Sequence, residues 1–212
     1  MTLRMEVSLT GVTPMIIHNG RTANPMNSYS KAMKNITSKR KKTEEDIEEL
    51  LSIQWESSLY WSDKIGLHMP TENILAALLK SAKKHKLGPS ISGFVFDEAV
   101  GFPIIAPHHD NFEEFKKDLS NKFVKAVTIQ RSKTISCRCI LNNWALSFSC
   151  EIDESIIDPS AAKLIVETMS KRIGIGVWTP SHPKPGTFGK FLINRLAFVN
   201  TETNEIKEYK LS

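Results

Sequence analysis

The chain has 212 residues, of which 41% are hydrophobic, and this is enough to form a sizeable core. No stretch reaches the roughly 20 consecutive apolar residues of a membrane-spanning helix, and Arg4 and Glu6 interrupt the segment where a signal peptide is apolar. The formal net charge of +5 favours association with a polyanion. We therefore expect one cytoplasmic domain without a membrane partner.

The cysteine and histidine patterns do not predict a metal or a cofactor. Cys137, Cys139 and Cys150 are an odd number in one strand-like region, which argues against a disulfide framework. The adjacent His108 and His109 lack the spacing of a helix-borne ligand pair. We expect the three cysteines to be buried, reduced thiols.

The first part of the chain predicts two strands, an arm and a helix. Residues 5–10 alternate apolar and polar side chains, which indicates a half-buried strand, and a second short strand covers 15–17. Residues 21–42 have no apolar periodicity and end in a basic run, so they predict a loop or arm. Apolar residues at three- and four-residue steps then predict a helix of about 17 residues after Thr43, with a weakened capping box.

The middle of the chain predicts a second helix and several strands. This helix starts near Pro70, in front of a regular apolar stripe. Short apolar runs at 94–96 and 102–105 indicate strands, and a polar segment follows them. Residues 124–140 and 144–152 predict a hairpin that turns at two asparagines.

The last part predicts a helix and two strands. Asp158 and Pro159 stand in the order of a helix cap and first turn, and Gly174 ends this helix. A glycine- and proline-rich segment leads to a strand over 191–199, and a short strand over 205–211 is expected to pair with it.

The order of these elements predicts an α+β protein with a ferredoxin-like or RRM-like βαββαβ core and an antiparallel sheet. We expect one such domain over residues 1–212, with a helical, basic insertion over 21–66 after the first strand. Helices would cover one face of the sheet. The other face would be open, and RRM-type proteins bind single-stranded nucleic acid there.

Three segments of the chain, 9–20, 67–80 and 174–190, together resemble the RAMP superfamily. They are the opening strand with its turn, the proline-led entry to a helix, and a glycine-containing loop. The resemblance implies an RRM-like fold and RNA binding, because this superfamily includes the guide-RNA-binding proteins and repeat-processing nucleases of CRISPR systems. The loop departs from the family pattern, since one tryptophan and three prolines stand among its glycines.

The whole chain also looks like a group of uncharacterised proteins of tailed phages and prophages. The shared features are the long Lys/Glu helix and the Gly-x-Gly-x-Trp segment at 174–178. This resemblance implies a location in the host cytoplasm and brings no established activity.

Basic residues in the arm, at the end of the second helix and in the hairpin are candidates for phosphate contacts, and the glycine-rich loop adds an aromatic residue. We expect nucleic-acid contacts from Lys39, Arg40, Lys41, Lys42, Lys80, Lys83, Lys84, Arg131, Lys133, Arg138, Trp178 and Lys190. Each set has a structural alternative. Acidic residues follow the arm and are able to pair with its basic residues. The charges of the hairpin are compatible with an ordinary solvated face of a sheet. The glycine-rich loop is compatible with a rigid connector.

The sequence therefore predicts a non-catalytic protein of phage type that binds single-stranded RNA or DNA through the basic arm, the hairpin and the glycine-rich loop. Two alternatives stay open. One is an interaction protein that acts on a host or phage protein, with counter-defence as one role, and that forms a homo-oligomer through its edge strands. The other is a metal-independent RNA-processing enzyme with His18 or His68 as the acid or base.

Overall fold

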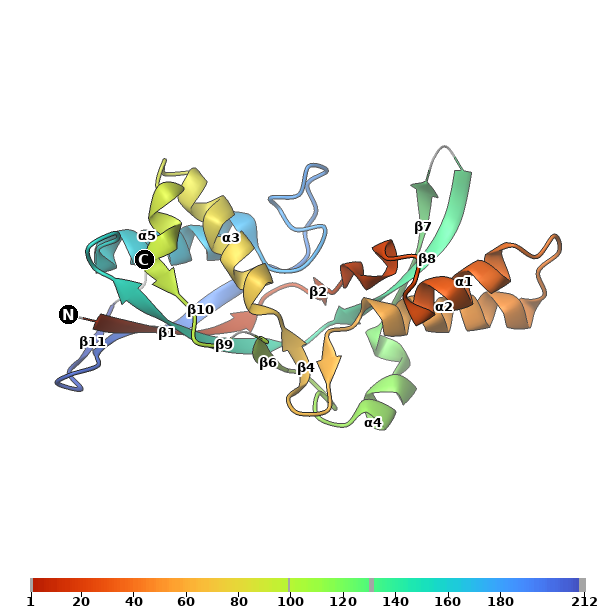
Figure 1. Ribbon diagram of the computed structural model, residues 1–212, viewed down its shortest axis with the longest axis horizontal. Coiled ribbons are helices and arrows are strands. Elements are labelled where there is room, and N and C mark those ends of the chain that lie inside the picture. The colour runs from red at the N-terminus through yellow and green to blue at the C-terminus, as the bar shows by residue number, and fades with distance from the viewer. Residues whose placement is uncertain (1, 99, 130–131, 210–212) are drawn as a thin grey trace.

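The computed structural model describes residues 2–98, 100–129 and 132–209, with side chains at all of these except 2, 128, 129, 132 and 133. It is an α+β protein with a large antiparallel sheet (Figure 1). The described residues form five α-helices: α1 (Ser28–Thr37), α2 (Glu44–Ser58), α3 (Thr71–Lys83), α4 (Phe112–Lys117) and α5 (Pro159–Thr168). Shorter helical turns are η1 (Gly20–Ala23), η2 (Pro89–Gly93), η3 (Leu119–Asn121) and η4 (Met169–Ile173).

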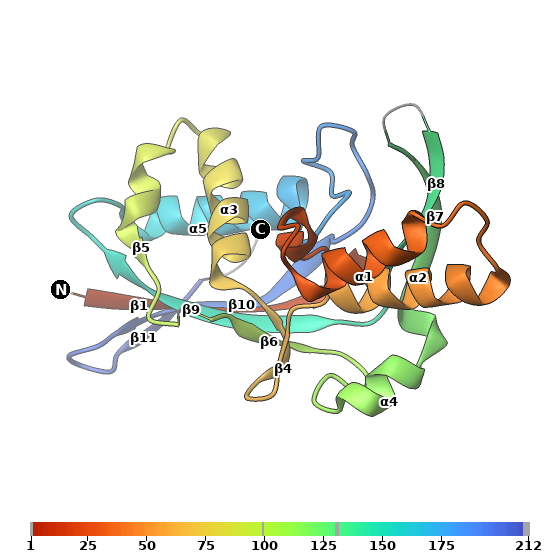
Figure 2. The same cartoon turned by 45° about the vertical axis from the view of Figure 1, so that its right-hand side comes forward.

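The large sheet has the strand order β11-β10-β1-β9-β6-β4-β3, and β5 also pairs with β9. Its strands are β1 (Thr2–Gly11), β3 (Trp61–Ser62), β4 (Gly66–Met69), β5 (Phe94–Val95), β6 (Phe102–Ile105), β9 (Ala145–Asp153), β10 (Phe191–Asn200) and β11 (Ile206–Glu208). The first long strand, β1, lies between β10 and β9 and is antiparallel to both. Helices α3 and α5 cover one face of this sheet (Figures 1 and 2).

The core lies between the sheet and these two helices. Met5, Val7 and Leu9 of β1 are at most 1% exposed, and Ile74 of α3 and Ile165 of α5 are fully buried. Burial of one such side chain contributes about 1.5–3 kcal/mol. The alternation predicted for the first strand is therefore confirmed, and it follows from the coverage of only one face of the sheet.

A second sheet has the order β2-β8-β7 and is made of β2 (Met15–Ile16), β7 (Lys122–Ile129) and β8 (Ser132–Leu141). The hairpin predicted from residues 124–140 and 144–152 is wrong. Strand β8 pairs with β7, whereas β9 pairs with β1. The alternating apolar side chains of β9 are buried beside β1 in the main core, while the β7–β8 hairpin projects from the main sheet beside α2 (Figure 2).

The prediction of a loop or arm over 21–42 is also wrong, because η1 and α1 lie there. The side chain of Asn27 accepts a hydrogen bond from the Tyr29 amide at 3.0 Å and so caps α1. Ile36 is buried, and the Tyr29 hydroxyl donates to Glu56 of α2 at 2.9 Å. These contacts hold α1 against α2, and the two helices form one end of the molecule (Figures 1 and 2).

The remaining predicted elements are confirmed with small changes in their bounds. The helices after residues 43, 70 and 158 are α2, α3 and α5, and the short strands at 94–96 and 102–105 are β5 and β6. The terminal strand is β11, and it pairs with β10 as expected, while residues 210 and 211 of the predicted strand lie outside the described residues. Helix α4 was not predicted and lies within a segment that reads as polar.

The three cysteines are free and buried, as predicted. Burial raises the pKa of all three thiols, that of Cys150 to about 12. Within the described residues, no helix is long and apolar enough to cross a membrane. In that same part of the chain, no three His, Cys, Asp or Glu residues gather closely enough to hold a metal ion.

Candidate nucleic-acid interface

One face of the β7–β8 hairpin is turned away from α2. Cys137 and Cys139 are buried, and their backbone amides donate to the side chains of Gln54 and Ser58 in α2. Because side chains alternate along a strand, Arg138 points to the opposite face. Phe123 of β7 is its cross-strand partner and lies on that same face.

The loop after α5 reaches this face because β2 links the two. Ile16 pairs with Ile140 of β8, and its carbonyl oxygen accepts a hydrogen bond from the Val177 amide at 3.0 Å. The next residue, Trp178, has a φ of +52°, which is strained for a bulky residue. Its carbonyl accepts from the amide of Phe188, so the two aromatic residues are held at neighbouring points of the loop.

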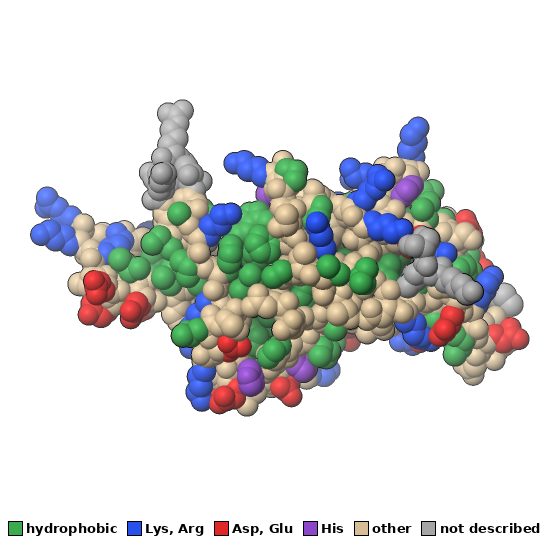
Figure 3. Space-filling model, turned by 180° about the vertical axis from the view of Figure 1, so that it is seen from behind, with side chains coloured by type: hydrophobic (Ala, Val, Ile, Leu, Met, Phe, Trp, Pro, Cys, Tyr) green, Lys and Arg blue, Asp and Glu red, His purple; other side chains and the backbone are tan. Residues whose placement is uncertain are grey.

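These elements bring together an aromatic–basic cluster, which we define as Phe123, Lys125, Arg138, Trp178 and Phe188. The ring of Phe123 meets the rings of Trp178 and Phe188 edge-on, with centroids 5.9 and 5.6 Å apart. The Lys125 ammonium lies 5.0 Å and the Arg138 guanidinium 4.8 Å from the centroid of Trp178. Figure 3 shows hydrophobic side chains with basic neighbours between the hairpin and the 177–189 loop.

The positive charge of the cluster is not compensated. In the part of the chain that the structure describes, neither Lys125 nor Arg138 forms an ion pair with an acidic side chain. Arg138 is half-buried, and this burial lowers its pKa from the usual value, although a guanidinium stays charged in proteins. The side chains of Trp178 and Phe188 are also half-buried, so parts of their rings face solvent.

A cavity of about 140 Å³ lies between β2, α3 and the same loop. Its polar side chains include His18, Asn73 and Lys80, and its lining contains no acidic residue. Desolvation by neighbouring atoms and the positive charge of Arg138 lower the pKa of His18. The cavity therefore adjoins the aromatic–basic cluster, because Val177 and Thr179 on either side of Trp178 line it, and Lys80 is the one charged side chain among its lining residues.

The glycines of the loop serve close packing of its backbone. Gly176 has a φ of +95°, and a Cβ there would lie 2.6 Å from the carbonyl oxygen of Ile16. Gly189 has a φ of +68°, and a Cβ there would collide with the carbonyl oxygen of Ile175. The amide of Gly189 donates to the Pro14 carbonyl at 2.8 Å. The backbone of the loop is therefore tightly packed and holds Trp178 in place. This agrees with the alternative in which the loop is a rigid connector.

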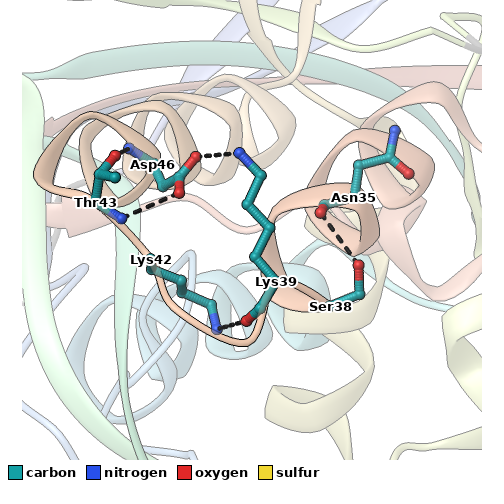
Figure 4. Close-up of polar contacts among 6 residues, drawn as sticks. All are labelled: Asn35, Ser38, Lys39, Lys42, Thr43 and Asp46. Carbon is teal, nitrogen blue, oxygen red and sulfur yellow. Dashed lines mark hydrogen bonds and ion pairs between the residues drawn. The ribbon is translucent and has the colours of Figure 1, made fainter.

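The basic run 39–42 forms the tip of the α1–α2 pair, far from the cluster (Figures 1 and 2). The Lys39 ammonium forms an ion pair with Asp46, and this bond raises the pKa of Lys39 and lowers that of Asp46 (Figure 4). Asp46 and Thr43 complete the predicted capping box, through backbone hydrogen bonds of 3.1 and 3.3 Å. The Lys42 ammonium donates to the Lys39 carbonyl, while the two residues between them are exposed.

The other predicted contact residues are dispersed. Lys83 and Lys84 are exposed at the C-terminal end of α3, where they suit the helix dipole. Lys190 is exposed, and its amide donates to the Thr13 hydroxyl at 3.0 Å. Arg131 and the side chain of Lys133 lie outside the described residues.

Of the predicted set, Arg138 and Trp178 meet in one cluster, and Lys80 lies at the neighbouring cavity. The prediction missed Phe123 and Lys125, although an aromatic and a basic residue two positions apart on a strand share one face. Of the two histidines considered for catalysis, His68 is buried, with only 6% of its surface exposed, whereas His18 is exposed to solvent.

No known protein-family model matches the chain, and no curated protein matches its sequence. The geometry of the site is therefore the evidence for its function, because fold alone does not determine function.

Proposed function

We propose that the protein binds single-stranded nucleic acid through the aromatic–basic cluster. The observation that supports this most strongly is the half-buried ring of Trp178, with Lys125 and Arg138 both within 5.0 Å of its centroid. Neither cation has an acidic partner among the described side chains. Unpaired cations beside an exposed ring favour a ligand that is both flat and anionic.

The chemistry of a single strand matches both parts of the cluster. Its unstacked bases offer faces that stack on aromatic rings, and its phosphates attract lysine and arginine. In a duplex the base faces are covered by their neighbours, so only the phosphate attraction is left. We therefore expect preference for single strands over duplexes.

The cavity beside the cluster supplies a second set of contacts in this proposal. Lys80 and His18 lie at its surface, and its lining has no carboxylate to repel a phosphate. A strand that stacks a base on Trp178 would have its backbone next to this cavity, because Val177 and Thr179, the neighbours of Trp178 in the chain, line the cavity together with His18.

The arrangement of the large sheet supports a RAMP-like, ferredoxin-like core as part of the same proposal. Strands β10, β1, β9 and β6 follow one another in that order, every neighbouring pair is antiparallel, and α3 and α5 lie on one face. This is the order expected when two strand–helix–strand units interlock. A phage-type protein with this core is our proposal for its family.

The open face of the sheet is less suited to base stacking than the cluster. Its side chains include Ser8 and Ser147, whose hydroxyls are 2.9 Å apart, and Arg195, which is paired with Glu6 and Glu208. We therefore assign binding to the face of the hairpin and the loop instead of the RRM-type sheet surface.

Fluorescence anisotropy with labelled single-stranded RNA, single-stranded DNA and duplex DNA of equal length tests this function. We expect the tightest binding with a single strand. We also expect log K to fall against log salt with a slope of about −0.7 for each phosphate contacted. Binding to none of the three, or binding that does not respond to salt, would contradict the proposal and favour a protein partner.

A further inference from the structure

A second pocket, of about 260 Å³, lies where η1, α1, α2 and β3 meet the start of α4. It shares no residue with the aromatic–basic cluster. The residues that line it are Arg21, Tyr29, Glu56, Leu59, Trp61, Asp63 and Phe112.

Aromatic rings form its apolar walls, and buried rings hold them in place. Trp61 meets Phe112 edge-on with centroids 5.1 Å apart, and both are half-buried. Behind them, Phe115 is 5.7 Å from Trp61 and stacks on Trp55 at 5.8 Å. Trp55 and Phe115 are at most 1% exposed. The walls are thus the outer end of a packed row of rings, and they are pre-formed for a flat ligand.

Most polar groups around the pocket are already engaged with one another. Glu56 accepts from the Tyr29 hydroxyl at 2.9 Å and pairs with Lys116 at 3.2 Å. The Arg21 guanidinium donates to the Leu59 carbonyl at 2.6 Å and lies 5.7 Å from the centroid of Tyr29. The hydrogen bond to Leu59 leaves several Arg21 N–H groups available to a ligand, since a guanidinium has five N–H donors.

Asp63 is the exception. It is exposed, it lines the pocket, and its carboxylate forms no ion pair with a described side chain. The two carboxylates at the pocket, Glu56 and Asp63, balance the two cations, Arg21 and Lys116. The pocket as a whole therefore favours a neutral ligand over an ion, and it offers such a ligand both hydrogen-bond acceptors and donors.

We propose that this pocket binds a nucleobase, and guanine in preference to the others. A base is flat and neutral, and its face stacks on aromatic rings while its edge forms hydrogen bonds. Guanine presents two adjacent N–H donors on one edge, which suit the free carboxylate of Asp63, and two acceptors on another, which suit Arg21. The inference rests on the proposed function, because the base would belong to a bound strand.

Free nucleosides test the pocket without phosphate attraction. In saturation-transfer NMR titrations with guanosine, adenosine, cytidine and uridine, we expect guanosine to bind most tightly. Asp63→Asn should lower the affinity for guanosine about tenfold, as expected for the loss of a pair of hydrogen bonds to one edge of the base. Glu113→Gln is the matched control, because Glu113 is an exposed acidic residue of α4 outside the pocket, and it should change nothing.

The outcomes separate the pocket from the cluster. Trp178→Ala should leave guanosine binding unchanged while weakening binding of a strand. Strand binding without nucleoside binding would overturn the pocket and leave the proposed function intact. Equal affinity for all four nucleosides, or equal loss in both carboxylate variants, would also overturn it. Binding of N-acetyl-arginine amide but of no nucleoside would overturn it in favour of a cationic side chain of a partner protein.

Discussion

Two regions of positive charge, the tip of the α1–α2 pair and the aromatic–basic cluster, differ in what surrounds the charge. At the tip, Lys39 is paired with Asp46, and acidic residues fill the first turn of α2. In the cluster, Lys125 and Arg138 face the ring of Trp178 without acidic partners in the described structure. Figure 3 shows acidic and basic side chains close together at the tip end.

This difference indicates that a run of lysines in the sequence is a weaker guide to binding than the setting of each cation. Charge next to a carboxylate is partly neutralised, so less of it is left to attract a phosphate. Charge next to an exposed ring acts together with stacking. If the cluster dominates binding, changes to its ring and its cations should weaken binding more than changes at the tip.

Trp178→Ala should cause the largest loss. The variant removes the ring on which a base would stack and which both cations face, so binding of single strands should weaken by roughly 1–3 kcal/mol. Trp178→Phe keeps a ring and should retain most of the affinity. Anisotropy titrations measure both, after circular dichroism has shown that the variants fold. An unchanged affinity for Trp178→Ala would exclude the cluster as the stacking site.

Much of the fold could be predicted from periodicity, but the pairing of strands that lie far apart in the sequence could not. The alternation in β1 and β9 was clear because a single face of each is buried in the main core. Residues 124–140 also looked like one strand, yet they belong to β7 and β8. Nothing in a single sequence shows that β9 pairs with β1 across more than a hundred residues, because that pairing depends on burial under α3 and α5.

The helix α1 was missed because polar residues outnumber apolar ones in it and only Ile36 is buried, although Tyr29, Met33 and Ile36 recur at helical spacing. The cluster was predicted in part. Arg138 and Trp178 were candidates from residue type alone, but their contact depends on β2, which joins the loop to β8 through Ile16. Phe123 was missed because its position opposite Arg138 required the correct hairpin register.

Gly189→Ala should damage the platform under Trp178. The residue has a left-handed φ, and an added Cβ would collide with the Ile175 carbonyl. We expect a loss of folding stability on the order of 1–3 kcal/mol together with weaker binding of single strands. Gly20→Ala is the control, because no atom lies within 4 Å of the added Cβ. Denaturant unfolding compares them, and equal stabilities would contradict the packing role of Gly189.

The pH dependence of binding should report on His18. Its pKa is below the usual 6.5, so it is neutral at pH 7 and gains charge only as the pH falls below that value. A bound phosphate favours the charged form, so affinity should rise on acidification, by about fivefold or less for one added charge. In the free protein the same lowered pKa favours unfolding below pH 6.5. His18→Gln should flatten both trends, and an unchanged profile would separate His18 from the site.

Lys80→Ala should have the smallest effect. Lys80 is exposed at the edge of the cavity and offers one phosphate contact, so the salt slope should fall by about 0.7. Lys31→Ala removes the same charge from α1, away from the cavity, and should leave the slope as it is. Titrations at several salt concentrations give both slopes. Equal slopes in the two variants would mean that the cavity takes no phosphate.

The most direct test compares two double variants that remove equal charge from the two regions. The cluster variant combines Lys125→Ala with Arg138→Ala. The tip variant combines Arg40→Ala with Lys41→Ala. Each double variant lowers the net charge of the protein by two. Binding of a labelled single strand is measured for both by anisotropy in the same buffer. We predict a loss of about tenfold or more for the cluster variant and less than threefold for the tip variant, given two phosphate contacts and stacking beside them. Equal losses, or a larger loss at the tip, would contradict the assignment of binding to the aromatic–basic cluster.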